Sequence, residues 1–198
     1  MPRPSLFEDD AFDATPAAAW PLFFALYPDA ETVARLERLL DELRRRLGMK
    51  APAVRNFHMT LFQPGPQSRL TRDEREAALE AGDRLRSAPF EVQLDQVVSL
   101  PNGQAAPPIV LRARDGLPAW LEFQRRLGMA AVAAGAVRAL PRYAPHLTLA
   151  YDRHRVEPID IEPIRWTVRS FALVCSHVGE GVHEPLRRWD LDGTGGER

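Results

Sequence analysis

The sequence predicts an α+β fold of two similar lobes around a central cleft. Its 198 residues are 45% hydrophobic, which is enough to bury one substantial core or two small lobes that share a seam. Segments with strand-like and helix-like patterns alternate in a similar order in the two halves of the chain, which indicates two related α+β units. No stretch between the halves is rich enough in Gly, Ser or Pro to separate them, so we expect one bilobed domain over residues 20–192.

Three strands and two helices are expected in the first half. Asp29 can begin the first helix, whose apolar residues recur on one stripe, and Gly48 can end it. Thr71 and Glu74 form a capping box at the start of the second helix. The expected elements are, in order, a strand at residues 20–27, a helix at 29–47, a strand at 57–62, a helix at 71–86 and a strand at 89–100.

Four strands and one helix are expected in the second half. A Pro- and Gly-rich turn at residues 101–108 joins the preceding strand to the next in a hairpin-like connection. Apolar residues from Leu117 to Leu127 recur at helical spacing, and the aromatic and β-branched residues from Trp166 to Val174 favour a strand. The expected elements are a strand at 109–113, a helix at 117–134, and strands at 143–151, 165–176 and 186–191.

Composition and charge argue against several classes of protein. The 26 Lys and Arg residues balance 27 Asp and Glu residues, and a net charge of -1 does not indicate a general nucleic-acid or anionic-surface binder. No apolar run approaches the length of a membrane span, and the single Cys175 cannot form an internal disulfide, so we expect a cytoplasmic protein without a membrane partner. Residues 1–19 lack the pattern of a secretory signal and are expected to form a flexible arm, and residues 193–198 a flexible tail.

A short motif occurs twice, once in each half of the chain. The sequence reads Phe-His-Met-Thr-Leu at residues 57–61 and Pro-His-Leu-Thr-Leu at residues 145–149, and the two histidines lie 88 residues apart. Both copies fall on expected strands, where side chains two residues apart share a face. Each copy therefore presents a histidine and a threonine together, opposite an apolar packing face. The four residues are His58, Thr60, His146 and Thr148.

Two imidazoles and two hydroxyls in one cleft suit the cleavage of a phosphate ester without a metal ion. One imidazole can take a proton from the attacking water while the other gives a proton to the leaving oxygen. The hydroxyls can donate hydrogen bonds to the non-bridging phosphate oxygens. Each proton transfer contributes about 10² to 10⁴ in rate, so the pair is sufficient in principle to open a strained cyclic phosphate.

Three other interpretations of the repeated motif compete with this one. A single His-x-Thr is typical of a half-exposed strand face, but packing alone does not require histidine and threonine on the polar face of both copies. A zinc site takes three or four protein ligands, and the sequence has no cysteine pair and no His-x-His or His-Glu-x-x-His pattern. A binding module that recognises a nucleotide or an RNA end without turnover is the main alternative. Two intact motifs favour an enzyme.

Residues near the two motifs are weaker candidates for the site. Arg153 can bind phosphate from the turn after the second motif. Phe62 shares the expected face of the first motif and can stack on a base or pack against the other lobe, whereas Tyr151 is expected on the packing face of the second. Three further histidines are expected at turns and strand ends, outside the catalytic set: His154, His177 and His183.

The paired motifs resemble those of the two-histidine (2H) phosphoesterases, and within them the RNA 2′,3′-cyclic phosphodiesterases also called 2′-5′ RNA ligases. The resemblance extends over about residues 20–191, and other similar segments lie at residues 22–26, 166–174 and 185–189. It departs from the family at two positions. Tyr151 stands where members often have an arginine, and His183 stands where they often have a tyrosine.

The resemblance implies a pseudo-two-fold arrangement of duplicated antiparallel sheets with flanking helices, in which both motifs line one groove. It implies hydrolysis of an RNA or nucleotide 2′,3′-cyclic phosphate to a 2′-phosphate without a metal or other cofactor, with 2′-5′ ligation as a minor reverse activity. His58 would protonate the leaving 3′ oxygen, and His146 would activate water. Thr60 and Thr148 would bind the phosphate oxygens. The substrates would be RNA 3′ ends or small cyclic nucleotides, and we expect a monomer.

Overall fold

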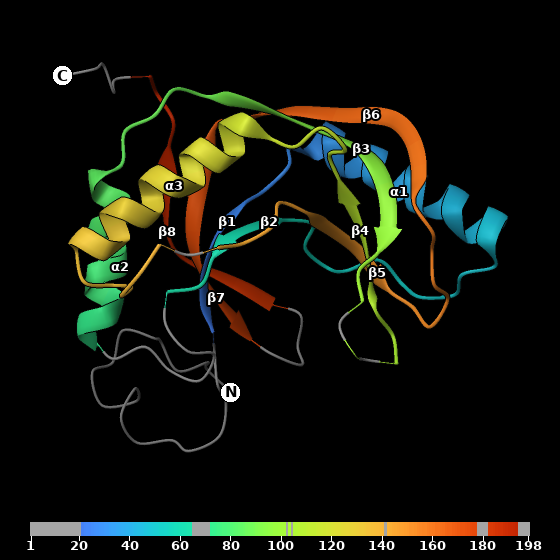
Figure 1. The fold of residues 1–198 in the computed structure, drawn as a ribbon, viewed down its shortest axis with the longest axis horizontal. Helices are drawn as coiled ribbons and strands as arrows, with labels where there is room; N and C mark the ends of the chain where they lie inside the picture. Colours follow the sequence, from blue (N-terminus) through green and yellow to red (C-terminus); the bar gives the residue numbers. More distant parts are fainter. Residues whose placement is uncertain are drawn as a thin grey trace, which may run out of the picture.

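The fold consists of two four-stranded antiparallel sheets with three helices in the described part of the chain (Figure 1). The computed structural model describes residues 21–64, 72–101, 103, 105–140, 142–177 and 182–193. In chain order the elements are β1 (Leu22–Leu26), α1 (Ala30–Leu47), β2 (Met59–Phe62), α2 (Arg72–Arg84), β3 (Phe90–Ser99), β4 (Pro108–Arg112), α3 (Pro118–Ala133), β5 (Leu147–Tyr151), β6 (Ile159–Val168), β7 (Ser170–His177) and β8 (Val182–Asp190). The predicted α+β class is confirmed.

The two sheets have the same internal order, related by a pseudo-two-fold arrangement. Their strand orders are β2-β1-β7-β8 and β5-β4-β3-β6. Each sheet contains a strand–helix–strand unit, β1-α1-β2 in one and β4-α3-β5 in the other, and the second strand of each unit forms an edge of its sheet. The two copies of the motif lie at these edge strands, with His58 directly before β2 and His146 directly before β5, so the strand expected at residues 143–151 begins only at Leu147. The duplicated, bilobed architecture expected from the order of the elements and from the family resemblance is confirmed.

The chain crosses between the two sheets, and one predicted strand is divided by such a crossing. Residues 165–176 were expected to form a single strand, but β6 ends at Val168 opposite Phe90 of β3, and β7 begins at Ser170 in the other sheet. Arg169 is the junction. The prediction was wrong because aromatic and β-branched residues continue across the junction, and a local pattern does not show that the partner strand changes.

The first helix begins and ends where its sequence signals indicate. The side chain of Asp29 accepts a hydrogen bond from the backbone N–H of Thr32 at 2.8 Å, which satisfies one of the free donors of the first turn. Gly48 adopts the left-handed conformation, with a φ of 69°, and ends the helix. At the second helix, Thr71 of the expected capping box lies outside the described residues.

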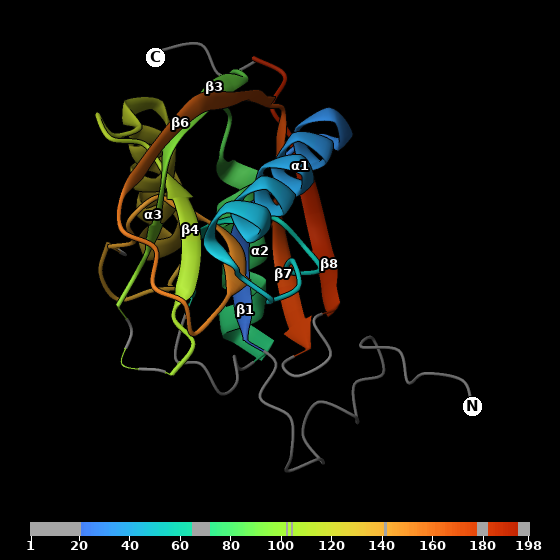
Figure 2. The same cartoon turned by 90° about the vertical axis from the view of Figure 1, so that its right-hand side faces the viewer.

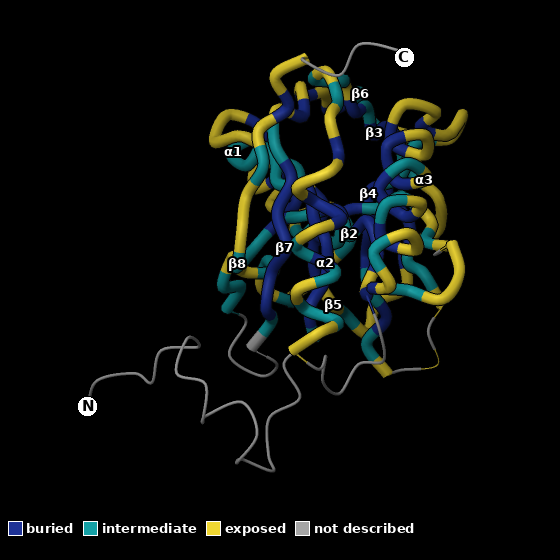
Figure 3. The backbone as a smooth tube through the Cα atoms, turned by 90° about the vertical axis from the view of Figure 1, so that its left-hand side faces the viewer, coloured by how far each residue is buried: buried dark blue, intermediate teal, exposed yellow. Residues whose placement is uncertain are grey.

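One continuous core links the two sheets, with Phe24 and Leu61 from one and Val92 and Trp166 from the other. The buried residues follow the strands, whereas exposed residues lie mostly on the helices and turns (Figure 3). Because neighbouring side chains on a strand face opposite ways, β1 also contributes to a smaller cluster on the other face of its sheet. That cluster consists of Phe23, Ala25, Ala172 and Val174, with Tyr27 packed against it.

The helices lie at opposite ends of the molecule, and one of them anchors the last strand. Figures 1 and 2 show α2 and α3 together at one end and α1 at the other. Trp189 of β8 stacks on Phe171 of β7 with ring centroids 4.8 Å apart, and its indole N–H donates to Asp83 of α2 at 2.7 Å. Gly82 of α2 leaves no space for a Cβ beside that indole ring. These contacts fix the position of β8.

The two ends of the chain lie mostly outside the described residues. The flexible arm expected at residues 1–19 lies wholly outside them, and of the expected tail at residues 193–198 only Gly193 is described. Within the described ranges, no helix combines the length and the apolar character that crossing a membrane requires.

Candidate active site

The first motif strand carries a β-bulge directly after its threonine. Thr60 lies opposite Ala25 in the pairing between β1 and β2. Phe62 lies opposite the next residue, Phe24, so Leu61 is an extra residue without a partner. The bulge interrupts the alternation of faces. Thr60 therefore lines the pocket described below, whereas Leu61 and Phe62 are both buried in the core.

The second motif strand carries the same bulge at the equivalent position. Thr148 and Ala150 of β5 lie opposite consecutive residues of β4, which leaves Leu149 as the extra residue. Leu149 and Ala150 are buried, and the next residue, Tyr151, is 53% exposed and lines the pocket. The two copies of the motif therefore share their backbone geometry as well as their sequence.

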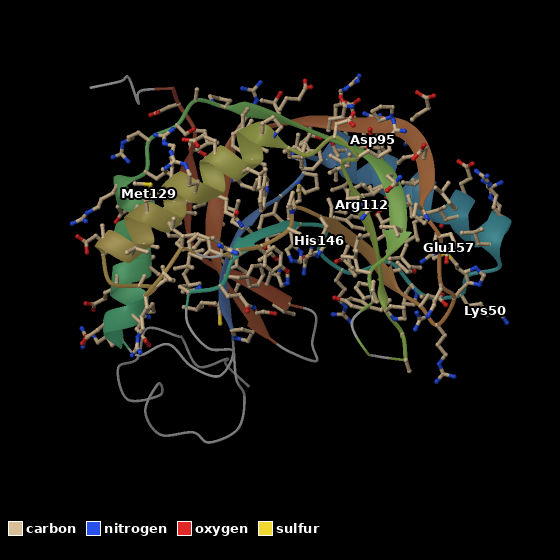
Figure 4. The ribbon with its side chains drawn as sticks, viewed as in Figure 1. Lys50, Asp95, Arg112, Met129, His146 and Glu157 are labelled. Atoms are coloured by element: carbon tan, nitrogen blue, oxygen red, sulfur yellow. The ribbon has the colours of Figure 1, made fainter. Side chains whose placement is uncertain are left out.

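Both copies of the motif line one pocket of about 580 Å³ between the sheets. His146 lies near the centre of the molecule, whereas Lys50 and Glu157 lie at its far end beside α1 (Figure 4). Gln63 and Tyr151, each three residues after a motif threonine, occupy equivalent positions in the lining. The lining residues are Pro21, Phe23, His58, Thr60, Gln63, Pro108, Tyr143, His146, Thr148, Tyr151, Ser176 and His183.

The two motif histidines are oriented in the same way by the backbone. The Nδ1 atom of His58 lies 2.8 Å from the carbonyl oxygen of Asn56, and that of His146 lies 2.9 Å from the carbonyl oxygen of Ala144. A carbonyl oxygen only accepts, so Nδ1 of each ring carries a hydrogen and donates it. In the neutral ring Nε2 is then the basic atom. Each imidazole can therefore take or give a proton at Nε2 without moving.

His58 lies among aromatic rings. Its centroid is 4.7 Å from that of His183, 5.3 Å from that of Phe23 and 6.1 Å from that of Tyr27. Burial lowers the pKa of His58 because it disfavours the charged ring, and the nearby His146 lowers it further. The hydrogen bond to the backbone carbonyl acts in the opposite direction but is the smaller effect. The pocket therefore holds His58 in its neutral form near pH 7.

His146 stacks on a tyrosine that also contacts the other lobe. The rings of Tyr143 and His146 lie 5.5 Å apart at an angle of 19°. The side chain of Tyr143 shares a hydrogen bond with the hydroxyl of Thr60. Tyr143 thus connects the histidine of the second motif to the threonine of the first, across the pocket.

The carbonyl groups of the two bulges are satisfied from the opposite lobe. The side chain of the buried Gln124 on α3 donates to the carbonyl oxygen of Leu61 at 2.6 Å and to that of Tyr143 at 3.3 Å. The carbonyl oxygen of Leu149 accepts from the backbone N–H of Val54, in the segment before β2, at 2.9 Å. These bonds hold the two motif strands beside each other.

The structure brings the four motif residues together, and it separates Arg153 from them. His58, Thr60, His146 and Thr148 all line the pocket. Arg153 is exposed in the turn after β5 and is not among the lining residues.

Two expectations about side-chain direction were wrong because of the bulges. Phe62 is only 1% exposed and packs against Phe24 with ring centroids 5.1 Å apart, so it does not face the pocket where a base would stack. Tyr151 was expected on the packing face and lies at the pocket. In each copy the extra residue of the bulge turns the following side chains to the other face.

Sequence reasoning missed several pocket residues, above all His183. This histidine was expected at the surface, but it lies on β8 opposite Ser176 of β7 and lines the pocket with it. The signal that could have found it is the departure from the family at this position. Tyr143 and Gln63 were also missed. Of the other histidines, His154 is exposed, and the side chain of His177 lies outside the described residues.

Within the described residues, no group of three or more His, Cys, Asp or Glu side chains is arranged to hold a metal ion. Cys175 is buried, and burial raises the pKa of its thiol to about 11.

Comparison with known proteins gives one family and a set of similar folds. The model of the 2′-5′ RNA ligase superfamily matches residues 28–180. Apo LigT of Escherichia coli superposes with a TM-score of 0.67 at 24% identity, covering 88% of this chain and 99% of that chain. TT0787 of Thermus thermophilus has a TM-score of 0.68 at 25% identity, covering 88% and 100%. No curated protein sequence matches the chain.

Proposed function

The chain belongs to the 2′-5′ RNA ligase superfamily, and from this membership we propose that it is a cyclic phosphodiesterase. It hydrolyses an RNA or nucleotide 2′,3′-cyclic phosphate to a 2′-phosphate. The observation that carries the proposal is the pair of imidazoles at one pocket, each with Nδ1 bonded to a backbone carbonyl and Nε2 available for proton transfer. Membership in a superfamily of phosphoesterases and ligases supports an enzyme. Two imidazoles that can each transfer a proton at Nε2 support hydrolysis.

In the proposed reaction water attacks phosphorus, the bond to the 3′ oxygen breaks, and the phosphate remains on the 2′ oxygen. His146 accepts the proton of the attacking water at Nε2. His58 donates a proton from Nε2 to the leaving 3′ oxygen. Thr60 and Thr148 donate hydrogen bonds to the non-bridging oxygens. Neither imidazole needs a metal ion in this scheme. A 5′-hydroxyl that attacks phosphorus in place of water would break the same bond and give a 2′-5′ linkage, which is the minor ligation activity.

The acid role of His58 requires a proton that this residue lacks in the free protein. Burial lowers the pKa of His58, so its ring is neutral near pH 7 before substrate enters. A bound phosphodiester places a negative charge against the ring, and an adjacent opposite charge favours the imidazolium. His58 therefore takes up its proton when the ligand binds.

A nucleotide-sized substrate fits the pocket. Its volume of about 580 Å³ falls within the roughly 300 to 1,000 Å³ of typical small-molecule sites. Escherichia coli LigT has been crystallised with 3′-AMP and with ATP, which supports a nucleotide or an RNA 3′ end as the ligand here. In our proposal the protein acts as a monomer, without a cofactor, in the cytoplasm.

The test is to incubate the purified protein with a nucleoside 2′,3′-cyclic phosphate in EDTA and to follow the products by phosphorus NMR. We expect the cyclic phosphate to open and a 2′-phosphate to accumulate at the same rate with and without EDTA. Loss of turnover in EDTA would contradict the metal-free mechanism. A 3′-phosphate product would show that the 2′ oxygen leaves and would contradict the proposed geometry of the substrate. Tight binding without turnover would identify a recognition module instead of an enzyme.

A further inference from the structure

A third imidazole, that of His183, lies beside the motif histidine His58 and is held on three sides. Its ring meets that of His58 nearly edge-on, with centroids 4.7 Å apart at 79°. It meets Phe23 of β1 in the same way at 5.1 Å and 76°. Its Nδ1 atom lies 3.0 Å from the hydroxyl of Tyr27. Because His183 also lines the pocket, the ring position leaves Nε2 as the atom available to a ligand.

The contact between the Tyr27 hydroxyl and Nδ1 of His183 fits the tautomer in which Tyr27 donates the hydrogen bond. Burial raises the pKa of the Tyr27 hydroxyl, which therefore keeps its proton and can donate it to Nδ1. Burial and the neighbouring His58 lower the pKa of His183 to about 4, so its ring is neutral at pH 7. A neutral imidazole that accepts at Nδ1 carries its hydrogen on Nε2. This tautomer is the opposite of that of His58 and His146.

We propose that His183, held by Tyr27, is a phosphate-binding residue that donates its Nε2–H to an oxygen of the phosphate beside His58. The assignment of the ligand rests on the proposed function, whereas the tautomer does not. The other lining positions that follow the motif threonines hold Gln63 and Tyr151, which are also uncharged donors. The pocket therefore meets the phosphate oxygens with uncharged hydrogen-bond donors around the two proton-transfer histidines.

An uncharged donor at this position has a specific advantage for the reaction. At 4.7 Å between ring centroids, a second positive charge would oppose the protonation of His58, because like charges at close range disfavour each other. A neutral Nε2–H binds the oxygen without this cost. His183 thus helps to hold the phosphate while it leaves the proton on His58.

The direct test reads the tautomers by long-range ¹H–¹⁵N NMR of protein labelled with ¹⁵N-histidine at pH 7, with inorganic phosphate as the probe. We expect Nδ1–H signals for His58 and His146 and an Nε2–H signal for His183, and we expect phosphate to shift the Nε2–H signal. Tyr27→Phe should change His183 to a mixture of tautomers. An Nδ1–H or imidazolium signal from His183, or no response to phosphate, would overturn the proposal even if the protein hydrolyses cyclic phosphates.

Kinetic variants separate donation from packing and from proton transfer. His183→Phe keeps a ring without a donor and should lower kcat/KM about 10- to 100-fold, as expected for a lost hydrogen bond to a charged group. His183→Gln places an amide N–H near Nε2 and should recover part of that loss, with the pH profile of kcat/KM unchanged in position. The matched control is His154→Gln, at an exposed histidine outside the pocket, and it should behave as wild type.

Two kinetic results would overturn the proposal. His183→Phe with wild-type kcat/KM would show that no donor is needed at this position. His183→Gln that is as inactive as His183→Phe and lacks one limb of the pH profile would show that His183 transfers a proton. If His183→Phe does not fold, the NMR titration of the wild-type protein decides. If no variant or wild-type protein turns over cyclic phosphate, the proposed function fails, and the response to inorganic phosphate still tests His183.

Discussion

The two motif histidines share the same backbone hydrogen bond but have different surroundings. His58 lies among the rings of Phe23, Tyr27 and His183, whereas His146 stacks on Tyr143. The backbone therefore gives both imidazoles the same tautomer, and burial among the aromatic rings lowers the pKa of His58. In acid–base catalysis by a pair of histidines one ring must hold a proton while the other accepts one, so the proposed acid role of His58 requires the bound phosphate to raise its pKa.

At the residue scale, we predict that binding of a cyclic phosphate near pH 7.5 takes up protons. A cyclic phosphodiester does not itself titrate in this range, so the uptake reports on the protein. The free protein has a lowered pKa at His58, and the bound anion raises it, so the ring gains a proton. The measurement is calorimetric titration in two buffers of different ionisation enthalpy. The His146→Ala variant is used because it should not hydrolyse the cyclic phosphate during the titration.

The matched control for proton uptake is the His58→Ala variant, which should bind the same ligand with less uptake. Equal uptake by the two variants, or release of protons on binding, would show that His58 does not become the acid in the complex.

At the scale of elements, the bulges in β2 and β5 decide which side chains reach the pocket. Gln124 of α3 satisfies the carbonyl of Leu61 in the first bulge and also bonds the backbone of Tyr143. The helix of one lobe thereby fixes the motif strand of the other. A buried carbonyl that loses its donor raises the free energy of the folded state.

We predict that Gln124→Leu lowers both stability and turnover. The loss of the donor to Leu61 should reduce the free energy of unfolding by about 1–3 kcal/mol, and kcat should fall because β2 and Tyr143 lose a common support. Urea unfolding and steady-state kinetics measure the two effects. The control is Gln93→Leu on β3, which removes only a solvent-exposed hydrogen bond from Arg165 and should cost no more than about 1 kcal/mol with kcat unchanged. Equal behaviour of the two variants would exclude a positioning role for Gln124.

The elements also show what the sequence could predict of the site. The repeated His-x-Thr identified all four central residues. Side chains two residues apart in extended backbone share a face, so each short motif is enough to place its histidine and its threonine on the same side. The same reasoning gave the wrong face for Phe62 and Tyr151, because the extra residue of each bulge is apolar like its neighbours and cannot be recognised from the sequence pattern. His183 was missed for another reason. Its place beside His58 results from the pairing of β8 with β7 and of β7 with β1, which no local pattern encodes.

At the scale of the whole molecule, the pocket is lined by residues of both lobes, so neither lobe forms it alone. The chain passes from one sheet to the other before β3 and again between β6 and β7, and one core joins the two sheets. The repeat in the sequence predicted two related lobes but not this exchange of strands, because a strand has the same apolar pattern in either sheet. Since the lobes share a core, His58 and His146 are held at a fixed relative position, as a concerted transfer of two protons requires.

The most direct test of one active site built from two lobes is the set of variants His58→Ala, His146→Ala and the double variant, measured by kcat/KM on a nucleoside 2′,3′-cyclic phosphate. If both imidazoles act in one transition state, each single change removes most of the turnover. The double change then costs far less than the product of the two, and circular dichroism confirms the fold of all three. Losses that multiply, or a single variant that retains wild-type turnover, would contradict the account.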